Sequence, residues 1–285
     1  MPRIWFVTGC SSGFGRQLAI AAAQNNDTVV ATSRDPSKLS DLIPLGIVPK
    51  ALDVGASDAE VKTVIDDVEA TVGPIDILVN NAGYILEGAV EECSNDEILA
   101  QFDINVFSQI RVLRAALPHM RARKSGVIAN FGSIGGWGGA PAAGFYCASK
   151  AAIAIYTEAL HFELAPLGID VTCIEPGYFR TNFLTGGHKI VAAKKIADLH
   201  AGLKEYRDAL AAYSLHQPGD PVKGAQVLVE ALTKSGRCEG RSLPPRLALG
   251  RDALEFIRGS TTKEREMLDS WEEIIGSTDC DDVQA

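Results

Sequence analysis

The amino-acid sequence predicts an α/β protein in which a doubly wound parallel sheet of about seven strands carries helices on both faces. Two observations support this prediction. Short apolar runs, bounded by glycine, proline or polar residues, alternate with longer helical patterns as far as about residue 250. These runs are apolar on both faces, as strands of a parallel sheet buried between two layers of helices are.

The predicted strands are short and rich in Val, Ile, Leu and Phe. In chain order they cover residues 4–8, 28–33, 48–52, 75–79, 126–131, 170–174 and 246–249. Two predicted helices, over residues 96–122 and 146–165, are apolar nearly all the way round. A surface helix is normally amphipathic, so we expect both to be covered on two sides, the outer side by a second subunit. The expected assembly is a homodimer or homotetramer.

The length of 285 residues and the 46% hydrophobic composition suit one core. We therefore expect a single domain over residues 1–276. Residues 183–217 form a Lys/Ala/Leu-rich helical stretch between the sixth and seventh strands, which is either a lid over a substrate site or a solvated helix. Residues 277–285 contain three aspartates and little that is apolar, so we expect a disordered tail.

Composition excludes several classes of function. The formal net charge of −9 would repel nucleic acid. No stretch approaches the ~20 apolar residues of a membrane span, and no signal-like segment opens the chain, so a cytoplasmic protein is expected. The six cysteines lack Cys-x-x-Cys pairs and the five histidines do not cluster beside them, which predicts reduced thiols and no metal site.

A glycine-rich loop follows the first strand and opens a helix. It consists of Thr8, Gly9, Cys10, Ser11, Ser12, Gly13, Phe14 and Gly15. Free amides at a helix N-terminus bind phosphate, and each glycine allows a tight turn or a close approach. An ordinary strand-to-helix turn would explain the loop alone equally well. A triphosphate-binding loop is disfavoured because Arg16 and Gln17 stand where Lys and Ser/Thr are needed, so a dinucleotide is the better ligand.

The end of the second strand indicates which dinucleotide. A site for NAD(H) normally has an acidic residue about 20 residues past the glycine loop, to hold the ribose 2′-hydroxyl. Here the strand ends in Ser33 and Arg34, and an arginine can hold a 2′-phosphate instead. The sequence therefore favours NADP(H). Asp35 leaves the alternative open, because it would face the ribose if the strand ended one residue later.

A second group of residues indicates acid/base chemistry. Tyr146 and Lys150 are four residues apart at the start of a helix, so their side chains share one face. A nearby ammonium group favours phenolate and is expected to lower the pKa of Tyr146. Ser133 follows the fifth strand, at the edge where doubly wound sheets bind ligands, and its hydroxyl can reach a substrate oxygen. By itself, Tyr-x-x-x-Lys is equally typical of an ordinary amphipathic helix.

Together these motifs resemble the short-chain dehydrogenase/reductase family in its shorter form, over about residues 3–250. The matching motifs are the loop from Thr8 to Gly15, Asp53-Val54, Asn80-Asn81-Ala82-Gly83, Ser133 with Tyr146 and Lys150, and Pro176-Gly177 with Thr181. The glycine loop and the Ser-Arg-Asp strand end are closest to hydroxysteroid and retinol dehydrogenases.

The resemblance implies a Rossmann-type fold and a role for each matching residue. Tyr146 would be the acid/base, Ser133 would orient the carbonyl, and Lys150 would bind the nicotinamide ribose. Asn105 would hold a water that links the lysine to solvent, or would be only a structural helix residue. The remaining matches would contact the cofactor: Asp53 and Val54 at the adenine, Asn81, Ala82 and Gly83 along the pocket wall, and Pro176, Gly177, Phe179 and Thr181 at the nicotinamide end.

The predicted function is NADP(H)-dependent reduction of a ketone or aldehyde, or oxidation of a secondary alcohol. Five residues on segments that should border the substrate would suit a lipophilic molecule, although each could equally belong to the core: Trp137, Tyr178, Phe179, Phe183 and Leu184. The alternative is a protein that binds NADP(H) without redox turnover, as a sensor, scaffold or cyclisation template. A sugar-nucleotide epimerase or dehydratase is disfavoured, because its glycine spacing and larger C-terminal half are absent.

Overall fold

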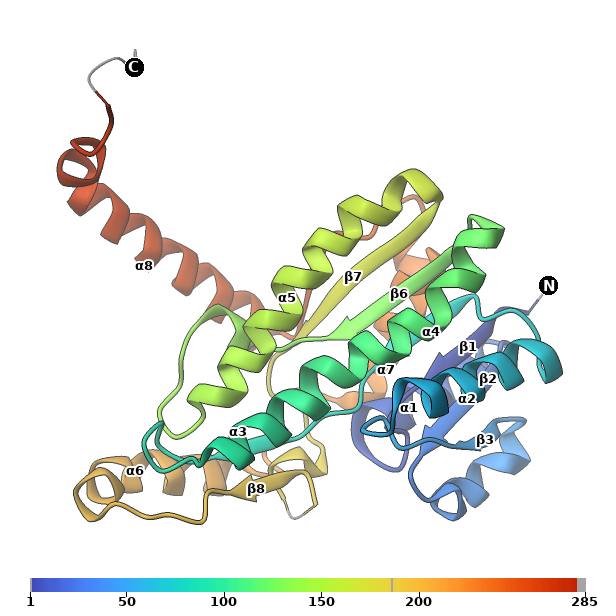
Figure 1. The fold of residues 1–285 in the computed structure, drawn as a ribbon, viewed down its shortest axis with the longest axis horizontal. Helices are drawn as coiled ribbons and strands as arrows, with labels where there is room; N and C mark the ends of the chain where they lie inside the picture. Colours follow the sequence, from blue (N-terminus) through green and yellow to red (C-terminus); the bar gives the residue numbers. More distant parts are fainter. Residues whose placement is uncertain (1, 186, 281–285) are drawn as a thin grey trace.

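The computed structural model describes residues 2–185 and 187–280. Its main sheet has seven parallel strands in the order β3-β2-β1-β4-β6-β7-β9 (Figure 1). The strands are β1 (Ile4–Val7), β2 (Thr28–Ser33), β3 (Val48–Ala51), β4 (Ile77–Asn80), β6 (Gly126–Phe131), β7 (Ile169–Pro176) and β9 (Arg246–Leu249). The predicted Rossmann-type sheet is confirmed. Its order reverses between β1 and β4, where loops diverge and leave a crevice at the carboxyl edge.

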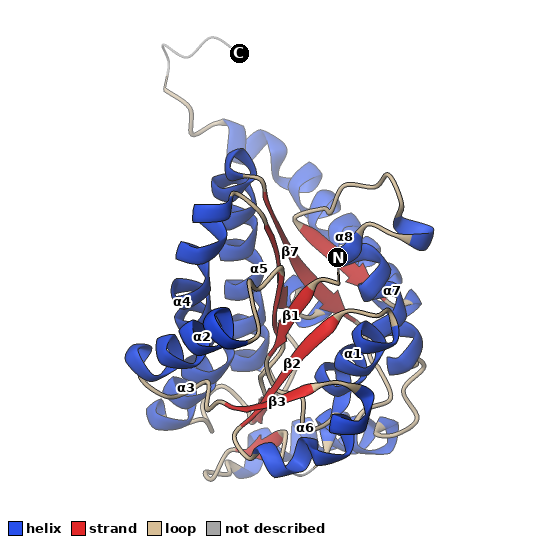
Figure 2. Cartoon of the chain, turned by 90° about the vertical axis from the view of Figure 1, so that its right-hand side faces the viewer, coloured by secondary structure: helices blue, strands red, loops and turns tan. Residues whose placement is uncertain are grey.

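Helices cover both faces of the sheet, as the sequence predicted (Figure 2). One face carries α1 (Gly13–Gln24), α7 (Pro221–Thr233) and the 3-10 segment η1 (Pro36–Leu45). The other carries α2 (Asp58–Thr71), α4 (Ser108–Arg123) and α5 (Gly144–Leu164). Each layer therefore buries one face of the same strands.

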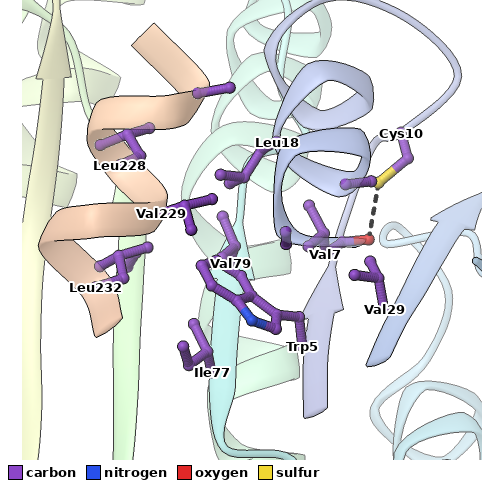
Figure 3. Packing of buried hydrophobic residues seen from close by; sticks show 14 of the residues in the cluster. Trp5, Val7, Cys10, Leu18, Val29, Ile77, Val79, Leu228, Val229 and Leu232 are labelled. Atoms are coloured by element: carbon purple, nitrogen blue, oxygen red, sulfur yellow. Dashed lines mark hydrogen bonds between the residues drawn. The ribbon is translucent and has the colours of Figure 1, made fainter. Parts of the chain in front are cut away.

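The first strand shows why the chain forms this sandwich. Trp5 points to one face, where Figure 3 shows it beside Ile77 and Val79 of β4, in the cluster that also contains Leu18 of α1 and Val229 of α7. Phe6, the next residue, points to the other face and packs with Ile65 of α2. Both aromatic side chains are fully buried. A strand whose successive residues are all apolar is stable only between two apolar layers.

The helix predicted over residues 96–122 contains a π-helical turn. It consists of α3 (Asn95–Phe102), the turn η2 (Asp103–Phe107) and α4, and the backbone stays helical at both junctions. No glycine or proline marks the turn, so the helix was predicted but its π-turn was not. Single π-turns are common at functional sites because they rotate a side chain out of the regular helical register. The residue in the middle of this turn is Asn105.

Several elements were not predicted. Two three-residue strands, β5 (Ile85–Glu87) and β8 (Lys189–Val191), pair as a separate parallel sheet. The unpredicted helix α8 (Arg251–Gly276) extends away from the body (Figure 1). Helix α6 (Ala197–Tyr213), by contrast, follows β8 within the helical stretch predicted over residues 183–217. The remaining 3-10 segments are η3 (Ile134–Trp137), η4 (Ala165–Leu167), η5 (Asn182–Leu184) and η6 (Gly236–Cys238).

Three further predictions concern the C-terminal tail, membrane spans and metal sites. Residues 277–280 lead away from α8 without regular helix, and residues 281–285 of the predicted tail lie outside the described residues. Within the described ranges, no helix has the length and apolarity that a bilayer span requires. No cluster of three or more His, Cys, Asp or Glu side chains suited to a metal ion occurs in the same ranges.

Candidate active site

A cavity of about 780 Å³ opens at the carboxyl edge of the sheet. The loops after β1, β2, β4, β6 and β7 contribute to its wall, together with residues from the segment that holds β8 and α6. The cavity therefore lies at the point where the strand order reverses, which is where open α/β sheets bind their ligands.

The glycine loop between β1 and α1 forms one end of the cavity. Gly9 and Gly13 have left-handed backbone angles, with φ of 72° and 59°, which suit glycine. Gly15 has no room for a side chain, since a Cβ atom there would lie 2.6 Å from the carbonyl oxygen of Gly9. Ser12 is the N-cap residue of α1, and its side chain makes no capping hydrogen bond. The positive end of α1 is thus presented to the cavity.

Thr8 and Asn81 lock this loop to the loop after β4. The Thr8 hydroxyl oxygen accepts hydrogen bonds from the backbone amides of Asn81 (2.9 Å) and Ala82 (3.1 Å). In return, Asn81 Nδ2 donates to the carbonyl oxygens of Thr8 (2.9 Å) and Gly9 (3.2 Å). Two segments more than 70 residues apart are therefore held at a fixed separation.

The tip of β2 presents a cation to the cavity. Arg34 is exposed at the cavity wall and, among the described residues, takes part in no hydrogen bond or ion pair. Asp35 does not line the cavity. Its carboxylate instead accepts hydrogen bonds from the amide (3.1 Å) and hydroxyl (2.6 Å) of Ser37, at the start of η1. This geometry favours Arg34 over Asp35 as the residue that faces a ligand.

Ser133, Tyr146 and Lys150 meet on the opposite wall of the same cavity. Lys150 Nζ donates to the carbonyl oxygen of Phe131 at 2.7 Å and lies 5.8 Å from the centre of the Tyr146 ring. Ser133 Oγ accepts from the amide of Gly135 at 3.0 Å, which orients the hydroxyl at the end of β6. A phenol, a hydroxyl and an ammonium group therefore converge from α5 and from the loop after β6.

Asn105 lies behind this wall and is fully buried. Its Oδ1 accepts from the amide of Tyr84 at 3.0 Å, and its Nδ2 donates to the Tyr84 carbonyl oxygen (3.0 Å) and to Ser149 Oγ (3.1 Å). A Cβ atom on Gly83 would lie 3.1 Å from Asn105 Oδ1 and 3.8 Å from Lys150 Nζ. The π-turn thus brings Asn105 and Lys150 to the same glycine.

Burial controls the protonation of the Tyr146–Lys150 pair. It raises the pKa of the Tyr146 phenol, although a hydrogen bond with Ser133 opposes this rise. Burial also lowers the pKa of Lys150, to about 8. The pKa of Tyr146 was expected to fall because of the neighbouring ammonium group. It rises instead, because desolvation of the phenol outweighs every favourable interaction.

Comparison with known proteins identifies the family. Residues 3–189 match the family model described as short chain dehydrogenase. A short-chain dehydrogenase from Streptomyces avermitilis of known structure is 38% identical and superposes with a TM-score of 0.88, over 98% of this chain and all of that one. The chain belongs to the short-chain dehydrogenase family. Within it, an oxidoreductase from Botryotinia fuckeliana is 32% identical over 96% of this chain and 98% of its own length. A 3-ketodihydrosphingosine reductase from Bacteroides thetaiotaomicron is 35% identical over 73% of each chain.

Most of the residues that the family motifs single out line the cavity of this short-chain dehydrogenase. They are Gly9, Ser11, Ser12, Gly13, Phe14, Ser33, Arg34, Asp53, Val54, Asn81, Ala82, Gly83, Ser133, Tyr146, Lys150, Pro176, Gly177, Phe179 and Thr181. Thr8, Gly15 and Asn105 lie behind the wall and support it.

Trp137 was predicted either to border the substrate or to belong to the core, and the structure places it outside the cavity. Its Nε1 donates to the buried carboxylate of Glu175 at 2.7 Å. The guanidinium of Arg246 lies 3.8 Å from the centre of the indole ring and is bonded to the same carboxylate. The other four expected border residues, Tyr178, Phe179, Phe183 and Leu184, do line the cavity.

Sequence reasoning missed residues that reach the cavity from distant elements. Tyr84, His188, Tyr206, Leu210 and Phe256 all line it. Tyr206 and Leu210 lie on α6, within the segment of residues 183–217 that was predicted to be either a lid or a solvated helix. This segment therefore borders the cavity. Their spacing of four residues on a helix was the available signal, since it places both on one face. His188 had no signal of its own in the sequence.

Proposed function

We propose that this short-chain dehydrogenase uses NADP(H) to reduce the carbonyl group of a neutral, lipophilic small molecule, with Tyr146 as the acid/base. The proposal depends on one observation: Tyr146, Ser133 and Lys150 face the same cavity as the glycine loop and Arg34. A phosphate-binding end and an acid/base end thus share one space, as transfer between a dinucleotide and a substrate requires.

The residues at the phosphate end fit a dinucleotide that carries a 2′-phosphate. The uncapped start of α1 offers free amides to a pyrophosphate, and Gly13 leaves this approach without a side chain. Arg34 offers a guanidinium free of ion pairs within the described chain. When bound there, the reduced nicotinamide would supply a hydride to the substrate carbon.

Replacing Arg34 tests the choice of cofactor. In the Arg34→Asp variant, the 2′-phosphate would meet a carboxylate in place of a guanidinium, so KM for NADPH should rise by about tenfold or more. KM for NADH should stay the same or fall, because a carboxylate can accept from the ribose hydroxyl. Steady-state kinetics with both cofactors provide the measurement. An unchanged KM for NADPH would contradict the assignment.

At the acid/base end, the raised pKa of Tyr146 keeps the phenol protonated at neutral pH. A protonated phenol can donate to the alkoxide that develops when a carbonyl is reduced, and Ser133 can donate a second hydrogen bond to the same oxygen. Lys150, whose pKa is about 8, is mainly an ammonium group at neutral pH and can bind the nicotinamide ribose. This protonation pattern supports the direction of carbonyl reduction.

The rest of the cavity supports a lipophilic substrate. Phe183 lies beside Tyr146, with ring centroids 5.9 Å apart. Further apolar and aromatic residues line the same cavity: Ile85, Leu184, Ile190, Leu210, Tyr84, Tyr178 and Tyr206. Among the described lining residues, one carboxylate (Asp53) and two cations (Arg34 and Lys150) carry charge. All three belong to the dinucleotide motifs. A charged substrate would lose its hydration without gaining a partner. The relative from Bacteroides thetaiotaomicron is named for the reduction of a ketone, 3-ketodihydrosphingosine, which supports carbonyl reduction.

Incubation of the purified protein with NADPH and paired carbonyl compounds tests the proposal. One series contains neutral ketones of increasing apolar size, and the matched series contains keto acids of the same carbon skeletons. Loss of NADPH absorbance should be faster with the neutral ketones and should increase with apolar size until the cavity is full. Tight NADPH binding with no turnover of any compound would instead favour a sensor, scaffold or cyclisation template.

A further inference from the structure

We propose that His188 is a third ligand, beside Ser12 and Arg34, of the 2′-phosphate that distinguishes NADP(H) from NAD(H). This inference rests on the NADP(H) assignment proposed above. None of the family motifs in the sequence includes His188.

The backbone holds His188 in place over the cavity. Its carbonyl oxygen accepts from the amide of Ile85 in β5 at 3.0 Å, and its own amide donates to the Thr185 carbonyl oxygen at 3.3 Å. The residue directly precedes β8, which pairs with β5. His188 is therefore fixed at the start of a strand, with its side chain on the cavity wall.

The imidazole reaches across to the glycine loop. His188 Nε2 and Ser12 Oγ are 2.8 Å apart, although the two residues are separated by 176 positions in the chain. Because the Ser12 hydroxyl does not cap α1, it is available for this contact. The pair closes the cavity over the start of α1, where an anionic cofactor group would meet free backbone amides.

Arg34 contributes a positive charge near this contact. Burial of the imidazole, and then that charge, lower the pKa of His188. Asp35, the carboxylate next to Arg34 in the sequence, is engaged with Ser37, and Asp53 accepts a hydrogen bond from the amide of Gly55 at 3.0 Å. A phosphate dianion placed between His188 and Arg34 would supply the missing negative charge and would favour the protonated imidazole.

The position also selects between the phosphates of the cofactor. The pyrophosphate of a dinucleotide lies on the N-terminus of the first helix, and the adenosine ribose lies at the tip of the second strand. His188 is hydrogen-bonded to Ser12 and lines the same cavity as Arg34, which follows the end of β2, so a phosphate held between the imidazole and the guanidinium would lie on the ribose side. A group there is expected to discriminate between cofactors, rather than strengthen the binding of both.

The test is direct binding by calorimetry, without turnover. The ligands are NADP⁺ and NAD⁺, together with the fragments 2′,5′-ADP and 5′-AMP, which differ only in the 2′-phosphate. His188→Gln keeps a hydrogen-bonding side chain and removes the imidazole that a bound phosphate would protonate. It should weaken binding of NADP⁺ and 2′,5′-ADP by about tenfold, the effect of losing one charge-assisted hydrogen bond. Binding of NAD⁺ and 5′-AMP should stay within about twofold, well below that tenfold step.

Lys189→Gln is the matched control. It removes the next cation along the chain, which pairs with Glu87 at 2.9 Å and does not line the cavity. It should leave the ratio of the NADP⁺ and NAD⁺ affinities unchanged, even if it loosens the β5–β8 pair. A melting curve of each variant verifies that it is folded.

Three results would overturn the inference. An unchanged affinity for NADP⁺ in His188→Gln would mean that the imidazole does not contact the cofactor. Equal weakening of NADP⁺ and NAD⁺ would place the histidine at the pyrophosphate or give it only a structural role. Equal affinities of the wild-type protein for NADP⁺ and NAD⁺ would refute the cofactor assignment itself, and this result is recognised before any variant is made.

Discussion

The carboxylate of Glu175 supports the loop that carries Ser133. Glu175 is buried in β7 and accepts hydrogen bonds from Nε of Arg246 (2.8 Å) and from Nε1 of Trp137 (2.7 Å). Trp137 ends η3, the short helix that begins directly after Ser133. The network therefore connects the core of the sheet to the hydroxyl that faces the substrate.

Glu175→Gln should destabilise the protein by about 3 kcal/mol, because it leaves the Arg246 guanidinium without its counter-charge in a largely buried site. Urea denaturation measures the loss. The control is Glu230→Gln, which breaks the more exposed pair with Arg237 and should cost clearly less, because solvent screens that pair. Equal effects of the two substitutions would contradict a structural role for the buried network.

Local spacing explains which site residues the sequence could predict. Tyr146 and Lys150 are four residues apart on one helix, so their proximity follows from helix geometry alone. The glycines of the loop after β1 are likewise recognisable from a continuous segment. Trp137 and His188 take their positions from partners that are distant in sequence, Glu175 and Ser12. No local pattern specifies such contacts, so the sequence left the position of Trp137 open and did not reveal His188.

Ion pairs attach the segment of β8 and α6 to the body of the protein. Arg207 on α6 pairs with the buried carboxylate of Glu92 at 2.6 Å, and Lys189 in β8 pairs with Glu87 in β5 at 2.9 Å. Glu92 also accepts from the backbone amides of Ala89 (3.0 Å) and Ile196 (3.1 Å). This segment carries Tyr206 and Leu210 into the cavity, so its attachment shapes the substrate site.

The attachment should weaken in acid. Burial alone would raise the pKa of Glu92, but the amides of Ala89 and Ile196 and the Arg207 guanidinium outweigh it and hold the pKa at about 2. The folded-state pKa is thus below the ordinary value of 4.5, so the stabilisation is complete above pH 4.5 and is lost as the pH falls towards 2.

Glu92→Gln tests this attachment at neutral pH. Amide hydrogen exchange in α6 should become faster than in the wild-type protein, while exchange in the central strands β1 and β4 should not change. Equal protection of α6 in both proteins would show that Glu92 does not hold the segment.

The sheet was predictable because its strands are apolar on both faces, and this property is legible in short stretches of sequence. The π-turn at Asn105 within the long helix could not be predicted, because the sequence of η2 contains no helix-breaking residue. The π-turn is stabilised by the contacts of Asn105 with Tyr84 and Ser149, which come from other elements. β5 and β8 were missed because each has only three residues and depends on the other.

The outer face of α5 bears on the assembly of the protein. Ile155 and Phe162 are two helical turns apart and are 63% and 65% exposed, so a broad apolar surface faces outward. We expect this surface to pair two chains. Sedimentation should give a species of at least twice 30.3 kDa, and the double variant Ile155→Glu and Phe162→Glu should be monomeric. A monomeric wild-type protein would remove this expectation.

The chemistry proposed for the protein requires the hydroxyl of Tyr146, and Tyr146→Phe removes only that group. The measurement is the rate of NADPH consumption by this variant with a ketone that the wild-type protein reduces, alongside the dissociation constant for NADPH. The rate should fall between about 100-fold and 10,000-fold, the usual contribution of a general acid, while the dissociation constant stays unchanged. Turnover at the wild-type rate with intact cofactor binding would contradict the role of Tyr146.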